Sequence, residues 1–237
     1  MVISGVLTVA LLALFQRYAK DQKTKNCILK IFAIITVAIH YSNLWVDYFV
    51  SGGNATIENN QILPVYPCNV VMWMLLIAAC LQDKKSLAFQ ILGEFCFWGG
   101  TVCSIVGVVL NVNFGHTPTL ADYDVLKGLL SHSTMLVGCL YMKVGGYIRI
   151  RVFNAVSVLC GLGSFVVCGR FVNSLYKRFG MTPPDGMMLV KNPYTNTSII
   201  VIGLWVVMLL FCGLALWEMR LPREERWYHK LRMRTGL

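Results

Sequence analysis

Four side chains that can take part in nucleophilic attack or proton transfer lie inside apolar stretches of this 237-residue sequence: His40, Cys68, Glu94 and His132. Ionisable groups at membrane depth are costly, so they usually face a protein interior or a cavity and mark functional sites. A cysteine and a histidine form the smallest nucleophilic pair, because the imidazole takes the proton and the thiolate attacks. The interpretation therefore begins with Cys68 and His132.

Counting residues from the ends of the apolar stretches places these two groups in one layer. A stretch that begins near Leu63 puts Cys68 about 7–8 Å below its outer edge, and one that begins near Asp124 puts His132 about 12 Å below. Pro67 precedes the cysteine and leaves backbone groups free, which can line a cavity and stabilise an oxyanion. The spacing thus predicts a thiol and an imidazole in the outer half of a helical bundle.

Each of these residues also has a structural interpretation. Eight other cysteines occur in the chain, most of them in apolar stretches, where a thiol is usually a small packing group. His132 and His40 can hydrogen-bond a neighbouring helix, and Glu94 can orient His132 or remain a protonated structural group. Asn69 and Asn173 add uncharged polar groups. A proton-coupled transporter would instead use His40, Glu94 and His132 as a relay.

The elements that position these groups are predicted by composition. The chain is 57% hydrophobic and 14% charged, whereas a soluble domain is roughly 45–50% apolar and about 25% charged. This excludes a disordered chain and makes a soluble enzyme a poor interpretation. A membrane helix needs about 20 apolar residues, and the sequence predicts an all-α bundle of seven membrane-spanning helices, at about 2–16, 27–50, 63–81, 86–110, 124–142, 150–175 and 197–218.

Orientation follows from the distribution of positive charge. With the N-terminus outside and the C-terminus inside, 16 of the 21 Lys and Arg residues fall on the inner side, as the positive-inside rule expects. The same rule accounts for the net charge of +10 without a nucleic-acid partner. We expect one seven-span domain over residues 1–218 and a basic cytoplasmic tail over residues 219–237.

No sequence pattern indicates a metal or an organic cofactor. The cysteines form no CxxC or CxxH pair, so we expect no zinc site. Nothing resembles a Walker loop or a dinucleotide fingerprint.

Four short motifs follow one another on successive spans. They are Leu63–Val71 (LPVYPCNVV), Gly93–Gly99 (GEFCFWG), Ser131-His132 and Asn173–Leu175 (NSL). In this order they resemble the YwaF-like family of bacterial seven-span membrane proteins, which is related to the eukaryotic transmembrane-protein-164 acyltransferase. The resemblance runs from about residue 31 to residue 210.

The resemblance implies a multi-pass phospholipid acyltransferase that acts on an acyl donor and a lysophospholipid among the membrane lipids. It makes Cys68 the acyl carrier and His132 the general base, and it matches Glu94 to a carboxylate of the bacterial members. Three features depart from the family pattern. Tyr66 stands where the bacterial members have a histidine, and Asn69 where the eukaryotic relative has one. Lys191–Tyr194 (KNPY) stands where a Gly-Pro-Trp-Pro segment is expected before the last span.

We assign Cys68, His132 and Glu94 to catalysis. The residues expected to bind substrate are Asn69, Asn173, His40 and Tyr66. The alternatives are a lipid ester hydrolase and a non-enzymatic transporter, receptor or scaffold. The expected location is a bacterial cell membrane, or an endomembrane in a eukaryotic host.

Overall fold

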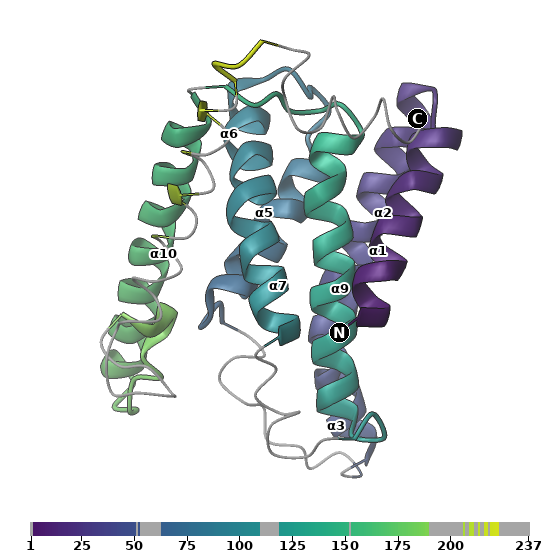
Figure 1. Cartoon of the computed structure of the whole chain (residues 1–237). Helices are drawn as coiled ribbons and strands as arrows, with labels where there is room; N and C mark the ends of the chain where they lie inside the picture. The colour runs from purple at the N-terminus through teal and green to yellow at the C-terminus, as the bar shows by residue number, and fades with distance from the viewer. Residues whose placement is uncertain are drawn as a thin grey trace.

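The computed structural model describes residues 2–50, 52, 63–109, 119–151 and 153–189, together with scattered residues between 206 and 222. These residues form helices and no strand (Figure 1). In chain order the helices are α1 (Val2–Tyr18), α2 (Gln22–Tyr41), α3 (Asn43–Val50), α5 (Pro67–Cys80), α6 (Leu87–Phe95), the π-helix η1 (Cys96–Gly100), α7 (Thr101–Val109), α9 (Tyr123–Val144), α10 (Phe153–Arg178) and the 3-10 helix η2 (Gly186–Met188).

The protein is an integral membrane protein by the length and apolarity of its helices. Four helical segments are long and apolar enough to cross a bilayer: Gln22–Val50, Leu87–Val109, Tyr123–Val144 and Phe153–Arg178. Two shorter apolar helices, Ile3–Tyr18 and Pro67–Cys80, accompany them. Six of the seven expected spans therefore coincide with helices. The seventh, 197–218, and the tail, 219–237, fall mostly outside the described residues, so the count of seven and the orientation of the termini stay predictions.

Polar caps define where several helices begin. Asp21 accepts a hydrogen bond from the backbone N–H of Thr24 at 2.8 Å and starts α2. Asp122 accepts from the backbone N–H groups of Asp124 and Val125 and starts α9. These oxygens satisfy N–H groups that have no partner within the helix. Pro67 stands at the first position of α5, where its missing N–H costs nothing.

The helices pack around α9 (Figure 1). This helix contacts α1 and α2 on one side and α7 with η1 on the other, while α10 contacts the rest of the bundle mainly through α6. Leu29, Leu75, Met135 and Cys139 are fully buried where α2, α5 and α9 meet. Large apolar side chains on the outer faces of α1 and α10 remain exposed, as a lipid environment allows.

A π-helical turn interrupts the long span that α6, η1 and α7 share. It ends at Gly99 and Gly100, and both glycines are buried. A Cβ atom at Gly100 would lie 2.5 Å from the sulfur of Cys139 on α9 and 2.9 Å from Val71 on α5. Glycine here therefore lets α5 and α9 pack against the same point of the span formed by α6, η1 and α7. This contact fixes the positions of α5 and α9 along the bundle axis.

Candidate functional site

Cys68 is the second residue of α5 and is partly buried. Its thiol donates a hydrogen bond to the side-chain Oδ1 of Asn69 at 3.2 Å, and Asn69 itself is fully buried. The first turn of a helix leaves backbone N–H groups without partners inside the helix. In this turn Pro67 has no N–H, and the backbone N–H of Asn69 already donates to the carbonyl of Tyr66 at 3.0 Å.

His132 lies in the middle of α9 and is held by its own helix. Its Nδ1 is 2.7 Å from the carbonyl oxygen of Gly128. Because a carbonyl only accepts hydrogen bonds, Nδ1 carries the proton and Nε2 is the atom that can accept one in the neutral ring. The ring packs directly on Gly107 of α7, where any Cβ atom would overlap it. Glycine at position 107 makes the space that the imidazole occupies.

The two groups share one wall of the bundle. Helices α5 and α9 both contact α7, and the ring of His132 covers Gly107 of α7. Val71 and Cys139 meet at Gly100, three residues from Cys68 and seven from His132. These residue counts place the imidazole about 6 Å further along the helix axes than the thiol.

This offset differs from the predicted order. Residue counting put His132 deeper than Cys68, whereas it lies nearer the end of the bundle at which α5 and α9 begin. The reason is that α9 extends past the end of α7 (Figure 1). Along the bundle axis, the first residues of α9 therefore lie beyond the start of α5. Among the described residues the hydrogen bonds of Cys68 and His132 go to Asn69 and Gly128 and do not join the two side chains.

Glu94 lies elsewhere, near the opposite end of the bundle. Its side chain is fully buried. Oε1 accepts from the guanidinium of Arg151, with distances of 2.9 Å to Nε and 2.8 Å to Nη2. Oε2 accepts from the hydroxyl of Ser157 at 2.6 Å. Gly107, which marks the level of His132, is about 20 Å away along the helix. The carboxylate therefore orients Arg151 and the start of α10, and it makes no contact with the imidazole.

Sequence reasoning missed the partners of Glu94. By charge alone Arg151 is one of many cations expected on the inner side, and no motif marks Ser157. A buried carboxylate does require a partner, but the sequence offers many cations at the same end. Nothing in the spacing of Glu94 and Arg151, 57 residues apart, distinguishes the correct one.

Asn173 and Tyr66 lie near the segment that leads into α5. The side-chain oxygen of Asn173 on α10 accepts from the backbone N–H of Gly186 at 2.7 Å. The residue after Gly186 contacts the segment before α5: the N–H of Met187 donates to the carbonyl of Val65 at 2.5 Å. Tyr66 packs against the small cluster around Val65. Both residues thus lie at the end of the bundle that holds Cys68.

His40 occupies the last turn of α2. Its ring meets the ring of Tyr41 edge to face, with centroids 5.0 Å apart. The hydroxyl of Tyr41 accepts from the indole N–H of Trp73 on α5 at 3.0 Å. The structure therefore places His40 close to the contact between α2 and α5, and its role in binding substrate stays a prediction.

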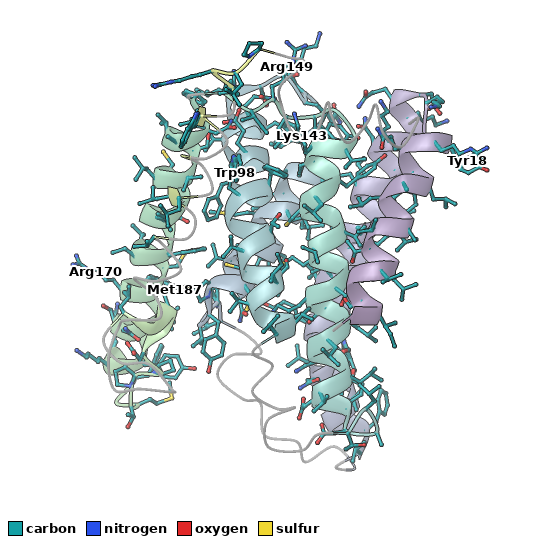
Figure 2. The ribbon with its side chains drawn as sticks, viewed as in Figure 1. Tyr18, Trp98, Lys143, Arg149, Arg170 and Met187 are labelled. Carbon is teal, nitrogen blue, oxygen red and sulfur yellow. The ribbon has the colours of Figure 1, made fainter. Side chains whose placement is uncertain are left out.

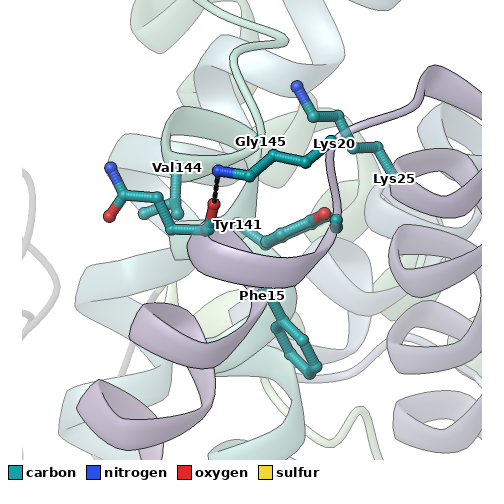
Figure 3. Close-up of a pocket in the computed structure, with 8 residues that line it drawn as sticks. Phe15, Lys20, Lys25, Tyr141, Val144 and Gly145 are labelled. Atoms are coloured by element: carbon teal, nitrogen blue, oxygen red, sulfur yellow. Dashed lines mark hydrogen bonds between the residues drawn. The ribbon is translucent and has the colours of Figure 1, made fainter.

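Two pockets lie at the end of the bundle opposite Cys68. Figure 3 shows the smaller one, of about 160 Å³, where the end of α1 meets the end of α9. Lys20 and Lys25 line it, and Lys20 donates to the carbonyl of Gln16 at 3.3 Å. The larger pocket, of about 650 Å³, is lined mainly by polar and basic residues. Within the described part of the chain no three His, Cys, Asp or Glu side chains gather to hold a metal ion.

One comparison with known proteins gives a match. The model of the TMEM164 family matches residues 1–219, which is most of the chain. No curated protein and no solved structure matches it. The match covers all the residues assigned to the candidate site. The bacterial YwaF-like grouping is not tested by it.

Proposed function

The chain belongs to the TMEM164 family, and from that premise we propose that it is a phospholipid acyltransferase in which Cys68 carries the acyl group. The observation that supports this most directly is the shared wall of α7. The thiol of Cys68 on α5 is partly buried, and both α5 and α9 contact α7, where the imidazole of His132 lies against Gly107. The thiol and the imidazole are offset by about 6 Å along the helix axes.

The reaction has two half-reactions that balance in atoms and protons. In the first, the sulfur of Cys68 attacks the ester carbonyl of the donor lipid, the carbon–oxygen bond breaks, and the leaving alcohol takes the thiol proton by way of His132. In the second, the hydroxyl of a lysophospholipid gives its proton to Nε2 of His132 and attacks the thioester. The carbon–sulfur bond breaks and the sulfur regains a proton.

The remaining candidates have supporting roles in this proposal. Asn69 holds the thiol through its side-chain oxygen, and the backbone at the start of α5 is proposed to stabilise the oxyanion. Tyr66, Asn173 and His40 are proposed to border the bound lipid. We leave Glu94 out of the catalytic group, because Arg151 and Ser157 occupy both of its oxygens.

The proposed orientation has seven spans, with the N-terminus outside. Four cations of the described residues lie at one end of the bundle. Arg17 and Lys143 stand in the last turns of α1 and α9, Lys84 follows α5, and Arg151 precedes α10. We place this basic end in the cytoplasm. Cys68 and His132 then face the outer leaflet of a bacterial cell membrane or the luminal leaflet of an endomembrane.

The test uses the full chain purified in nanodiscs, with a donor phospholipid carrying a labelled acyl chain and an unlabelled lysophospholipid acceptor. We expect Cys68→Ser to abolish both transfer and the hydroxylamine-sensitive acyl adduct on the protein. Cys168→Ser is the matched control, since Cys168 is also partly buried. Transfer that persists in Cys68→Ser would overturn the proposal. Release of free fatty acid without any transfer would replace it with an ester hydrolase.

A further inference from the structure

The larger pocket lies at the cytoplasmic end proposed above, away from the acyl site. It opens between the start of α2, the loop at 82–85 and the segment 146–151. Among its lining residues are the cations Lys84, Lys85, Arg149 and Arg151, against the acid Asp83. Figure 2 labels Arg149 at this end of the bundle. We call this site the basic pocket.

Two of its cations are held in place by the protein. The ammonium of Lys84 donates to the carbonyls of Ala78 and Ala79 at 2.8 and 2.9 Å, at the end of α5. The guanidinium of Arg151 is fixed by Glu94. Burial, followed by the charge of Lys30, holds the pKa of Lys84 below its ordinary value. The positive surplus of the pocket comes from its composition, because Lys85 and Arg149 line it in addition to these two cations.

The other polar groups are available to a ligand. Lys85 and Arg149 are exposed, and within the described residues neither side chain forms an ion pair. The side-chain oxygen of Asn26 accepts from both Gln22, at 2.9 Å, and the hydroxyl of Tyr147, at 2.7 Å. Since its oxygen is used in this way, Asn26 presents its amide N–H groups as donors. Such a combination of mobile cations and fixed donors suits a phosphate with neighbouring hydroxyls.

We infer that the basic pocket binds the phosphorylated head group of an anionic phospholipid in the leaflet at this end of the bundle. A lipid is favoured over a soluble phosphate compound because the two helices that the pocket loop 82–85 joins carry exposed apolar side chains: Leu87 on α6 is 64% exposed and Ile77 on α5 is 50% exposed. Acyl chains can lie along these residues while the head group occupies the pocket. Basic pockets between membrane helices at the cytoplasmic side commonly bind such head groups.

This site is separate from the proposed acyl-transfer site. Cys68 is the second residue of α5 and Cys80 is its last, a separation of about 18 Å along the helix axis. The inference therefore does not rest on the proposed enzyme activity, and a chain that transfers no acyl group can still bind the lipid.

The test measures binding to the full chain in a neutral detergent by native mass spectrometry and thermal shift. The probes are dioctanoyl phosphatidylinositol monophosphate, dioctanoyl phosphatidylcholine, coenzyme A and inorganic phosphate. The variant is Lys85→Gln with Arg149→Gln, which removes two exposed charges and no hydrogen bond of the described fold. Its control is Lys177→Gln with Arg170→Gln, an equally exposed Lys and Arg on α10 near the opposite end.

We expect the anionic lipid to bind the unaltered chain and the control alike, and to bind the Lys85/Arg149 variant about 30-fold more weakly, since each cation contributes about 1 kcal/mol. Phosphatidylcholine should bind all three forms equally and weakly. Equal lipid affinity of the two double variants would overturn the inference. Binding of coenzyme A or phosphate at the pocket without the lipid would overturn its lipid part and assign the pocket to a soluble phosphate compound.

Discussion

The two ends of the bundle treat their ionisable residues in opposite ways. At one end the Glu94 carboxylate is fully buried, and both of its oxygens bind partners on or next to α10. At the other end Cys68 and His132 are partly buried, and their hydrogen bonds to residues that the structure describes stay within their own helices. A buried group whose atoms are all engaged holds the structure together. A group with an atom left for a substrate is the better candidate for chemistry.

Replacing His132 tests this contrast with the largest expected effect. In His132→Ala we expect acyl transfer to fall by about 10³-fold, within the usual range for loss of a general base. The temperature of unfolding should change little, because the hydrogen bond that the ring forms in the described part of the chain goes to a carbonyl of its own helix. Radiolabel transfer and thermal unfolding are measured on the same preparation. A transfer rate within about twofold of that of the unaltered chain would contradict the assignment of His132 as general base.

Replacing Glu94 tests the other end. Glu94→Ala leaves Arg151 without its buried partner, and we expect the free energy of unfolding to fall by about 3 kcal/mol. Denaturant titration in mixed micelles measures this loss. Arg151→Met, which leaves the carboxylate unpaired instead, should cost a similar amount. The transfer rate of the protein that remains folded should stay near normal. A selective loss of transfer with normal stability would move Glu94 back into the catalytic group.

A glycine substitution sharpens the comparison without touching an ionisable residue. A Cβ atom at Gly107 would overlap the ring of His132, so Gly107→Ala must displace the imidazole. We expect transfer to fall by about 10²-fold, as a misplaced catalytic group commonly causes. Gly163→Ala is the control, because a Cβ there meets nothing within 4 Å. Equal rates for the two variants would show that the position of the imidazole does not matter.

The smallest effect is expected at Lys84. Its ammonium bonds two carbonyls at the end of α5, and Lys84→Met should lower the free energy of unfolding by about 1 kcal/mol, the typical net value of such bonds at a partly exposed site. Lys85→Met, one residue further on, serves as the control and should leave stability unchanged. A denaturant titration distinguishes the two, and an equal response would mean that the helix end needs no cation.

Much of the helical framework follows from the sequence. The expected spans 86–110 and 124–142 lie within two residues of Leu87–Val109 and Tyr123–Val144. Apolar length alone predicts these, since only a helix satisfies its backbone in lipid. The expected span 27–50 fits less well. Its helix starts at Gln22, because Asp21 caps it in a stretch too polar to count as membrane, and it is divided into α2 and α3.

The arrangement of the site was harder to predict. Cys68 and His132 lie on helices that both contact α7, but their relative depth depends on how far α9 extends past α7, which apolar length does not reveal. The π-helical turn at Cys96–Gly100 changes which residues of the central span face α5 and α9. No pattern of hydropathy marks it. The pairing of Glu94 with Arg151 depends on the packing of α10 against α6, a contact that is distant in sequence.

Helix α10 connects the two regions mechanically. At its start, Ser157 bonds Glu94 and Arg151 precedes the first turn. Near its far end, Asn173 holds Gly186, whose neighbour Met187 bonds Val65, three residues before the thiol. A bilayer that becomes thicker or thinner changes the tilt of a spanning helix. Any such tilt of α10 therefore strains the ion pair and the approach to Cys68 at once, so that membrane thickness and the geometry around the sulfur are physically coupled.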